Sequence, residues 1–150
     1  MPQAMATEIE RQCEAIEACY EFTLSYAARG LTSEDGSDAG RLLRDHLTRA
    51  AEAMRGLARS CTDILEQEQL EPAEKYEAFF EVLKRDVEGG VAAVDLVLAQ
   101  PTIGSQLIDN LNASIHLRAL LADLFLVTEI LNARRTQANA EAASGSAGAR

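Results

Sequence analysis

The strongest pattern in this chain is a run of apolar residues whose spacings alternate between four and three positions. The run consists of Leu43, Leu47, Ala50, Met54, Leu57, Cys61 and Ile64. This spacing places all seven side chains on one stripe of a helix. We therefore predict a long helix that begins after a cap at Ser37 or Asp38, ends near Gln67, and packs along its whole length against other helices.

Helical periodicity also covers three other segments. The first, residues 7–28, ends before Gly30, which suits the left-handed position that follows many helices. The second, residues 72–98, begins at Pro72, whose missing amide hydrogen costs nothing in a first helical turn. The third, residues 105–134, follows a Pro- and Gly-containing break in the chain.

Four helices joined by three fairly short connections favour an all-α fold, specifically an antiparallel up-and-down four-helix bundle over residues 1–135. Residues 136–150 are rich in Ala, Ser, Gly and Asn without apolar periodicity, which predicts a disordered C-terminal tail. Gly89 and Gly90 fall within the helix expected at residues 72–98 and cost about 1 kcal/mol each relative to alanine. A kink or a close helix crossing is the expected explanation.

Composition narrows the classes of partner. The chain has 150 residues, a hydrophobic content of 47% and a net charge of −10. This acidity argues against binding to nucleic acid or to an anionic membrane, and leaves a protein partner with a basic surface as a possibility. No segment approaches the ~20 apolar residues of a membrane span, and the first residues lack the features of a secretory signal. We expect a cytoplasmic protein whose three cysteines are reduced, with Cys13 and Cys61 buried and inert.

The segment 105–134 has two apolar arcs when it is plotted at 100° per residue. The broad arc contains Ala113, Leu117, Leu120, Leu121, Leu124 and Leu131. The narrow arc contains Ile108, Ile115, Ala119 and Leu126. One arc suffices for a four-helix core, so the narrow arc predicts the interface of a homodimer.

The histidines and a line of polar residues on the last predicted helix are the candidates for a metal or ligand site. A carboxylate-bridged di-iron bundle needs Glu-x-x-His pairs, but Leu43 and Ala113 stand three positions before the two histidines. No metal site and no cofactor are therefore predicted. Four polar residues share an arc of ~60° on the last helix: Asp109, Asn112, His116 and Asp123. They form either a ligand-facing stripe or a solvent-exposed ridge, and we favour the ridge because asparagine is a poor transition-metal ligand.

His46 is either a half-exposed histidine beside the apolar stripe that pairs with a neighbouring carboxylate, or a reactive side chain. Arg49 follows it by three positions and the small residue Ala50 by four. This segment resembles histidine phosphotransfer domains, which are four-helix bundles with one reactive histidine on a helix face. The resemblance covers about five residues and implies a phosphotransfer role for His46 with Arg49 beside it. Thr48 stands where that family has an apolar residue, and Ala50 where it has glycine.

The chain contains no P-loop, dinucleotide-binding glycine motif, Cys-x-x-Cys pair or nucleophile elbow. We therefore predict a non-enzymatic helical bundle that acts through protein–protein contacts, as an adaptor, assembly factor or regulatory subunit, and that forms a homodimer. One alternative is a phosphotransfer module that uses His46. The other is a bundle that binds a small ligand or cofactor near four aromatic residues: Tyr20, Tyr26, Phe79 and Phe80.

Overall fold

The computed structural model describes residues 2–34 and 36–148, and its regular structure is helical. The helices are α1 (Pro2–Ala28), α2 (Asp38–Gln67), α3 (Ala73–Leu98), α4 (Ser105–Ala113) and α5 (Ile115–Gly148). The predicted all-α class is thus confirmed. Within the part of the chain that the structure describes, no helix has a stretch long and apolar enough to cross a membrane.

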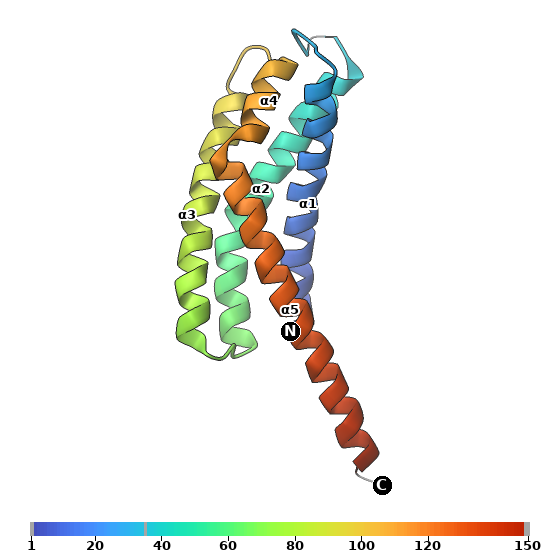
Figure 1. The fold of residues 1–150 in the computed structure, drawn as a ribbon, viewed down its shortest axis with the longest axis vertical. Coiled ribbons are helices and arrows are strands. Elements are labelled where there is room, and N and C mark those ends of the chain that lie inside the picture. The colour runs from blue at the N-terminus through green and yellow to red at the C-terminus, as the bar shows by residue number, and fades with distance from the viewer. Residues whose placement is uncertain (1, 35, 149–150) are drawn as a thin grey trace.

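The apolar stripe of α2 is buried from end to end, as the spacing predicts. All seven of its side chains are at most 1% exposed. Ser37 caps the helix, because its Oγ accepts a hydrogen bond from the backbone N–H of Gly40 at 3.0 Å. Helices α1 and α3 pack against α2 (Figure 1), so α2 is the helix around which the core is built.

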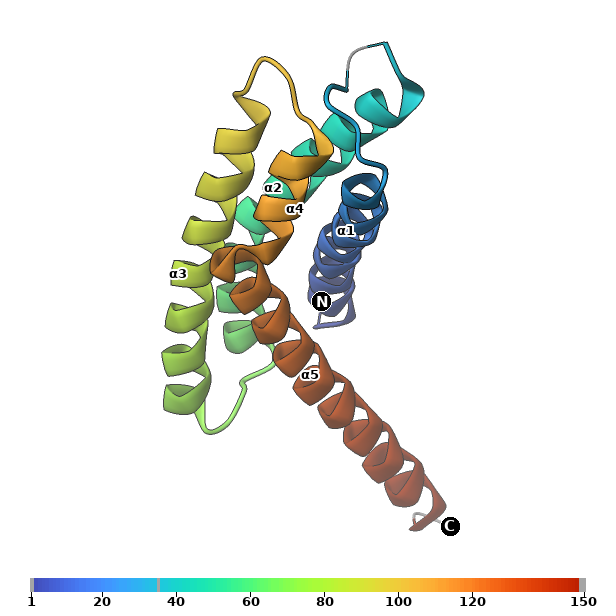
Figure 2. The ribbon, with the colours of Figure 1, turned by 45° about the horizontal axis from the view of Figure 1, so that its top comes forward.

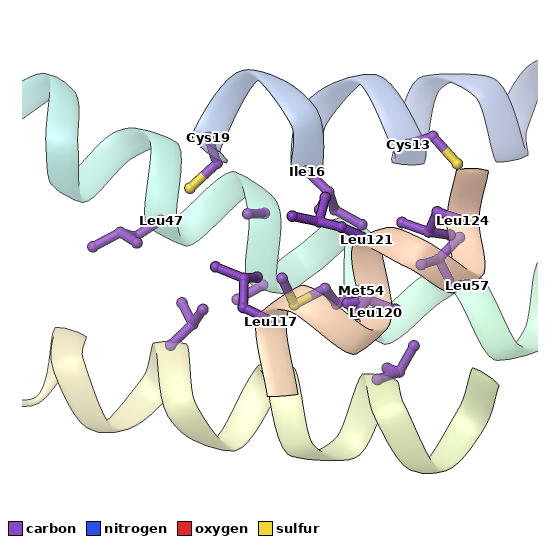
Figure 3. Packing of buried hydrophobic residues seen from close by; sticks show 14 of the residues in the cluster. Cys13, Ile16, Cys19, Leu47, Met54, Leu57, Leu117, Leu120, Leu121 and Leu124 are labelled. Carbon is purple, nitrogen blue, oxygen red and sulfur yellow. The ribbon is translucent and has the colours of Figure 1, made fainter. Parts of the chain in front are cut away.

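The rest of the core comes mainly from α1, α3, α4 and α5. In Figure 3 the side chains of Cys13, Ile16 and Cys19 point from α1 toward those of α2 and α5. The five leucines of the broad arc are buried on the inner face of α5: Leu117, Leu120, Leu121, Leu124 and Leu131. Ala113, the remaining residue of that arc, is not among the buried residues. Apart from Tyr26 and Met54, the buried hydrophobic core consists of aliphatic and cysteine side chains.

The helix predicted over residues 105–134 is broken at Ser114, which corrects the sequence prediction. Ser114 has φ −59° and ψ 131°, which is not helical. Its hydroxyl accepts a hydrogen bond from the backbone N–H of His116 at 3.3 Å, and serine favours such positions at helix starts because it bonds the free amides. The chain therefore turns between α4 and α5 (Figure 2), and the two helices present different faces to the core.

Residues 136–148 continue α5 as a helix, although the sequence predicts a disordered tail. Alanine has the highest helix propensity of the amino acids, and extending an existing helix avoids the cost of nucleation. All side chains at positions 136–146 are exposed, and this segment projects beyond the other helices (Figure 1). The last two residues of the predicted tail lie outside the described residues.

The paired glycines of α3 mark a close helix crossing. A Cβ atom on Gly90 would lie 3.3 Å from Cδ2 of Leu120 and 3.5 Å from Sδ of Met54. A Cβ atom on Gly89 would lie 2.9 Å from Nδ1 of His116. The start of α5 therefore approaches the backbone of α3 at this point, and of the two explanations predicted for these glycines the structure supports the crossing.

Candidate functional site

An apolar groove opens between α3 and α5 on the side of the crossing nearer the N-terminus of α3. The two helices meet closely at Gly89 and diverge from there (Figure 2). The groove has a volume of about 240 Å³ and is lined by Lys75, Tyr76, Phe79, Phe80, Leu126, Val127, Ile130 and Leu131. Lys75 is the only charged side chain in this lining. Such a surface suits apolar side chains better than a polar substrate.

Large apolar side chains of α5 are exposed in this groove and next to it. The exposed fractions are 50% for Leu126 and 38% for Ile130, which line the groove, and 57% for the neighbouring Phe125. Single exposed apolar residues are common, but a group of them on one helix next to an apolar groove is typical of an interaction surface. This is the strongest candidate for a functional site in the molecule.

The narrow arc predicted as a dimer interface is divided by the break at Ser114. Ile108 is fully buried in the core, so the prediction is wrong for this residue. Because α4 and α5 are separate helices, a stripe drawn through both does not exist in the fold. Ile115 and Leu126 are exposed and Ala119 is half-buried, so these three share the outer side of α5.

The polar line is divided in the same way, and its description as a solvent ridge is wrong for Asn112. This side chain is buried, and its Oδ1 accepts a hydrogen bond from Thr23 Oγ1 at 2.9 Å. Asp109 and His116 are exposed, and the imidazole of His116 lies over Gly89. The four residues therefore do not face a common ligand.

Asp123 lies on α5 against Asp86 of α3, near the helix crossing. Burial, a hydrogen bond with Asp86 and the charge of Asp86, in that order of size, together raise the pKa of Asp123 from 3.8 to about 7. Oδ2 of Asp123 is buried and has no donor from another protein group. A proton on one carboxyl group supplies the donor that the pair otherwise lacks, so the two helices pack most favourably when these groups share a proton.

His46 is half-buried and stacks on an aromatic ring. Its ring centroid lies 4.6 Å from that of Phe22, with 24° between the planes. Arg49, the second residue of the proposed phosphotransfer pair, forms an ion pair with Asp45 at 3.1 Å. The stacking covers one face of the imidazole, and the phosphotransfer role stays a prediction.

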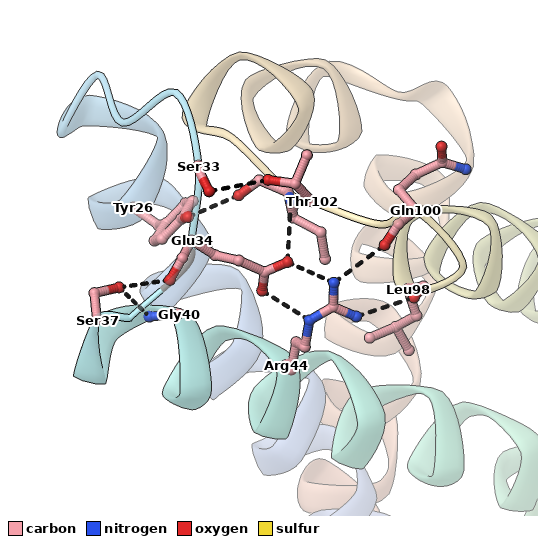
Figure 4. Close-up of polar contacts among 10 residues, drawn as sticks. Tyr26, Ser33, Glu34, Ser37, Gly40, Arg44, Leu98, Gln100 and Thr102 are labelled. Atoms are coloured by element: carbon pink, nitrogen blue, oxygen red, sulfur yellow. Dashed lines mark hydrogen bonds and ion pairs between the residues drawn. The ribbon is translucent and has the colours of Figure 1, made fainter.

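A polar cluster that the sequence did not reveal joins the loop before α2 to the loop before α4 (Figure 4). Glu34, only 7% exposed, accepts hydrogen bonds from Nε and Nη2 of Arg44 at 2.7 and 2.5 Å and from the backbone N–H of Ile103 at 3.1 Å. Arg44 also donates to the carbonyl groups of Leu98 and Gln100, each at 3.1 Å. These polar groups bind one another, so the cluster fastens the two loops to α2. Glu34 lies in a Gly/Ser-rich loop, where no helical spacing indicates which residue its side chain contacts, so the pairing with Arg44 could not be predicted from the sequence.

The four aromatic residues proposed as a ligand site are not brought together. Tyr26 is buried at the end of α1, where its hydroxyl donates to the carbonyl of Ile103 at 2.8 Å. Phe79 and Phe80 line the groove in the first half of α3, and Tyr20 packs partly buried against the core. The aromatic residues available to a ligand in the groove are therefore Tyr76, Phe79 and Phe80.

The three cysteines are free and buried. Burial is the main cause that raises the pKa of each thiol to about 12, so each is held as the unreactive thiol, as predicted for Cys13 and Cys61. Among the residues that the structure describes, no group of three or more His, Cys, Asp or Glu side chains is placed to hold a metal ion. Comparison with protein-family models, with curated proteins and with solved structures finds no match to this chain.

Proposed function

We propose that this chain is a non-catalytic protein that acts through protein–protein contacts, as an adaptor, assembly factor or regulatory subunit. Its architecture is an antiparallel up-and-down four-helix bundle in which α4 and α5 together take the place of the fourth helix. The observation that carries the proposal is the apolar groove between α3 and α5 with the exposed apolar side chains beside it.

The groove suits an amphipathic helix from a partner protein. In such complexes a few large apolar side chains on one face of the helix enter a hydrophobic groove. Each buried leucine, isoleucine or phenylalanine contributes roughly 1.5–3 kcal/mol, against a cost of several kcal/mol for association. Two or three anchors supply roughly 3–9 kcal/mol in total, so the groove by itself supports weak binding and further contacts outside it would have to raise the affinity. The net charge of −10 favours a partner whose anchors are flanked by basic residues.

The two alternative functions have less support. A pocket of about 240 Å³ is smaller than the ~300–1,000 Å³ that is typical of small-molecule and cofactor sites. Its lining offers one charged group to orient such a ligand, whereas small-molecule sites place several polar groups around an apolar cavity. For phosphotransfer, the stacking of His46 on Phe22 covers part of the ring that a partner would have to reach.

Site-specific photo-crosslinking tests the proposal. A photoreactive phenylalanine analogue at Phe79, in the groove, should capture a discrete protein from an extract of the native cells. The same analogue at Leu96, which is on α3 and 66% exposed but outside the groove lining, is the matched control. The captured segment, made as a synthetic peptide, should bind the purified chain, and Ile130→Asp should weaken that binding at least tenfold. Equal capture from both positions, or peptide binding that ignores Ile130→Asp, would contradict a groove-based function.

A further inference from the structure

Two carboxyl groups meet between α3 and α5. Asp123 and Asp86 form a hydrogen bond, and Oδ2 of Asp123 is buried without a donor from another protein group. Ionised carboxylates only accept hydrogen bonds, so a bond between two of them requires a proton on one. This acid pair, Asp86 and Asp123, is therefore a contact that joins the two helices only while it holds a proton.

No cation faces the acid pair from one turn away on its own two helices. The positions three and four residues from the carboxyl groups are uncharged: Ala119, Leu120, Leu126 and Val127 on α5, and Val82, Leu83, Gly89 and Gly90 on α3. Lys84, Arg85 and Glu88 are closer in sequence to Asp86, but they are exposed, and residues one or two positions apart do not face the same way on a helix. Repulsion within the ionised pair is therefore not offset from these turns.

The charged groups of the other helices that pack on α5 lie away from the acid pair. Asp109 of α4 is exposed. About three turns beyond the pair, Arg134 forms an ion pair with Glu68 at the end of α2, at 3.2 Å, and Arg135 forms one with Glu10 of α1. These two ion pairs hold the middle of α5 in place, so a movement near the acid pair shifts packed helices without releasing α5.

The acid pair lies between the helix crossing and the apolar groove. Along α3, Asp86 is one turn from Gly89, over which the exposed imidazole of His116 lies. Along α5, Asp123 is one turn before Val127, which lines the groove. The distance between the two carboxyl groups therefore affects the width of the groove more directly than any other polar contact of α3 and α5 described above.

The break at Ser114 supplies a hinge for α5. Its φ of −59° and ψ of 131° interrupt the helix between α4 and α5, and a few non-helical residues at the end of an element are where such rotations occur. At 1.5 Å per residue, Asp123 lies ~14 Å along the helix from this hinge and Ile130 ~24 Å. A rotation that separates the acid pair is thus nearly doubled at Ile130, in the groove.

We propose that the acid pair is a pH-dependent contact that sets the width of the groove between α3 and α5. With one proton shared, its oxygen atoms stay ~2.6 Å apart, as in an O–H···O⁻ hydrogen bond. When the proton passes to solvent, both carboxylates are hydrated, and a water molecule between them holds the oxygen atoms ~2 Å further apart. The hinge enlarges this separation to ~3–4 Å at Ile130.

The change falls in the physiological pH range, because the pKa of Asp123 is raised to about 7. The groove is then narrow at pH 5 and wider at pH 8. This inference rests on the proposed function for its consequence: the volume of about 240 Å³ admits a few side chains, and the wider groove admits more of a partner helix. By linkage, a partner that prefers the wider groove releases the proton of the acid pair as it binds.

Distances between spin labels test the movement without any partner. Labels at Ala78→Cys on α3 and Ala133→Cys on α5, both exposed positions, report the separation of the two helices, while the native cysteines are buried. From pH 5 to pH 8 this distance should increase by ~3–4 Å. In Asp123→Asn it should stay at the pH 5 value, because the amide donates to Asp86 at both pH values.

The matched control pair is Thr62→Cys with Ala78→Cys, which joins α2 to α3 and should show the same distance at both pH values. Asp109→Asn, an exposed aspartate of α4, should leave the response of the first pair intact. A wild-type distance that does not change between pH 5 and pH 8 would overturn the inference. So would a change that persists in Asp123→Asn.

Proton release separates this inference from the proposed function. The synthetic peptide captured at the groove should bind at least about threefold more tightly at pH 8 than at pH 5. Calorimetry at pH 7 in buffers of different ionisation enthalpy should show that protons are released, and Asp123→Asn should abolish both effects. Peptide binding without them would overturn the inference and leave the groove proposal standing. Absence of any captured partner, with the spin-label response intact, would contradict the groove proposal and leave the pH-dependent contact standing.

Discussion

Removal of Arg44 should destabilise the protein far more than removal of a neighbouring surface arginine. Arg44 is the partner of the Glu34 carboxylate, which is 7% exposed, and it also binds two carbonyl groups of the segment between α3 and α4. In Arg44→Leu the carboxylate of Glu34 loses both hydrogen bonds from Arg44 and keeps the one from the backbone N–H of Ile103. A buried carboxylate without its cation is a costly arrangement.

The size of the loss follows from the burial of the two partners. Breaking a fully buried ion pair costs about 3–5 kcal/mol. Because the side chain of Arg44 is 37% exposed, water reaches one side of the pair, and we expect a loss near the lower limit, about 3 kcal/mol. For a chain of this size such a loss lowers the midpoint of thermal unfolding by roughly 6–12 °C.

Urea unfolding followed by circular dichroism measures the effect. Arg41→Leu is the matched control, since Arg41 is one turn away and forms an ion pair with Asp38 in which both side chains are more than 80% exposed. This variant should lower the free energy of unfolding by less than about 0.5 kcal/mol. Adding Glu34→Gln to Arg44→Leu should recover part of the loss, because the amide removes the buried charge. A loss in Arg44→Leu no larger than in Arg41→Leu would show that the pair is solvated and would refute the reasoning.

Three further predictions test the helix crossing and the core. Because the pKa of Asp123 is raised to about 7, its stabilising contribution is present below about pH 4 and is lost as the pH rises through about 7. The thermal midpoint of Asp123→Asn relative to wild type should therefore be higher at pH 8 than at pH 5, whereas the exposed control Asp109→Asn should show no such change. The same difference between Asp123→Asn and wild type at both pH values would contradict this. Gly90→Val should lower the free energy of unfolding in urea by about 1–3 kcal/mol, because the side chain overpacks against Leu120 and Met54. Gly89→Ala should leave it unchanged or raise it by up to about 1 kcal/mol, because the exposed His116 can move aside. Equal effects of the two variants would argue against the close crossing. The three thiols should react with Ellman's reagent in urea at least a hundred times faster than in the folded protein, and fast reaction of the native chain would refute their burial.

The stripe of α2 and the groove show how far local patterns reach in this chain. A heptad within one continuous helix reports directly which face is buried, so the stripe of α2 and the burial of Cys13 and Cys61 could be predicted from spacing. The type of residue at the helix start predicted a cap at Ser37 or Asp38, and the structure has Ser37. The close crossing at Gly90 was among the predicted explanations, because a residue without a Cβ atom in mid-helix needs a reason. The groove itself could not be foreseen, because its width depends on the angle at which α5 leaves α3.

The sequence by itself determined the helices and the faces on which most of them pack, because hydrogen bonding and side-chain direction within a helix repeat over a few residues. Only the tertiary structure decided where the last predicted helix breaks, since the apolar spacing across Ser114 is compatible with one helix or two. That break buries Ile108 and Asn112 and leaves Ile115 exposed. Likewise, the contact between Glu34 and Arg44 depends on how two loops from opposite halves of the chain meet on α2. Such long-range contacts are set by the packing of whole helices, which no local spacing encodes.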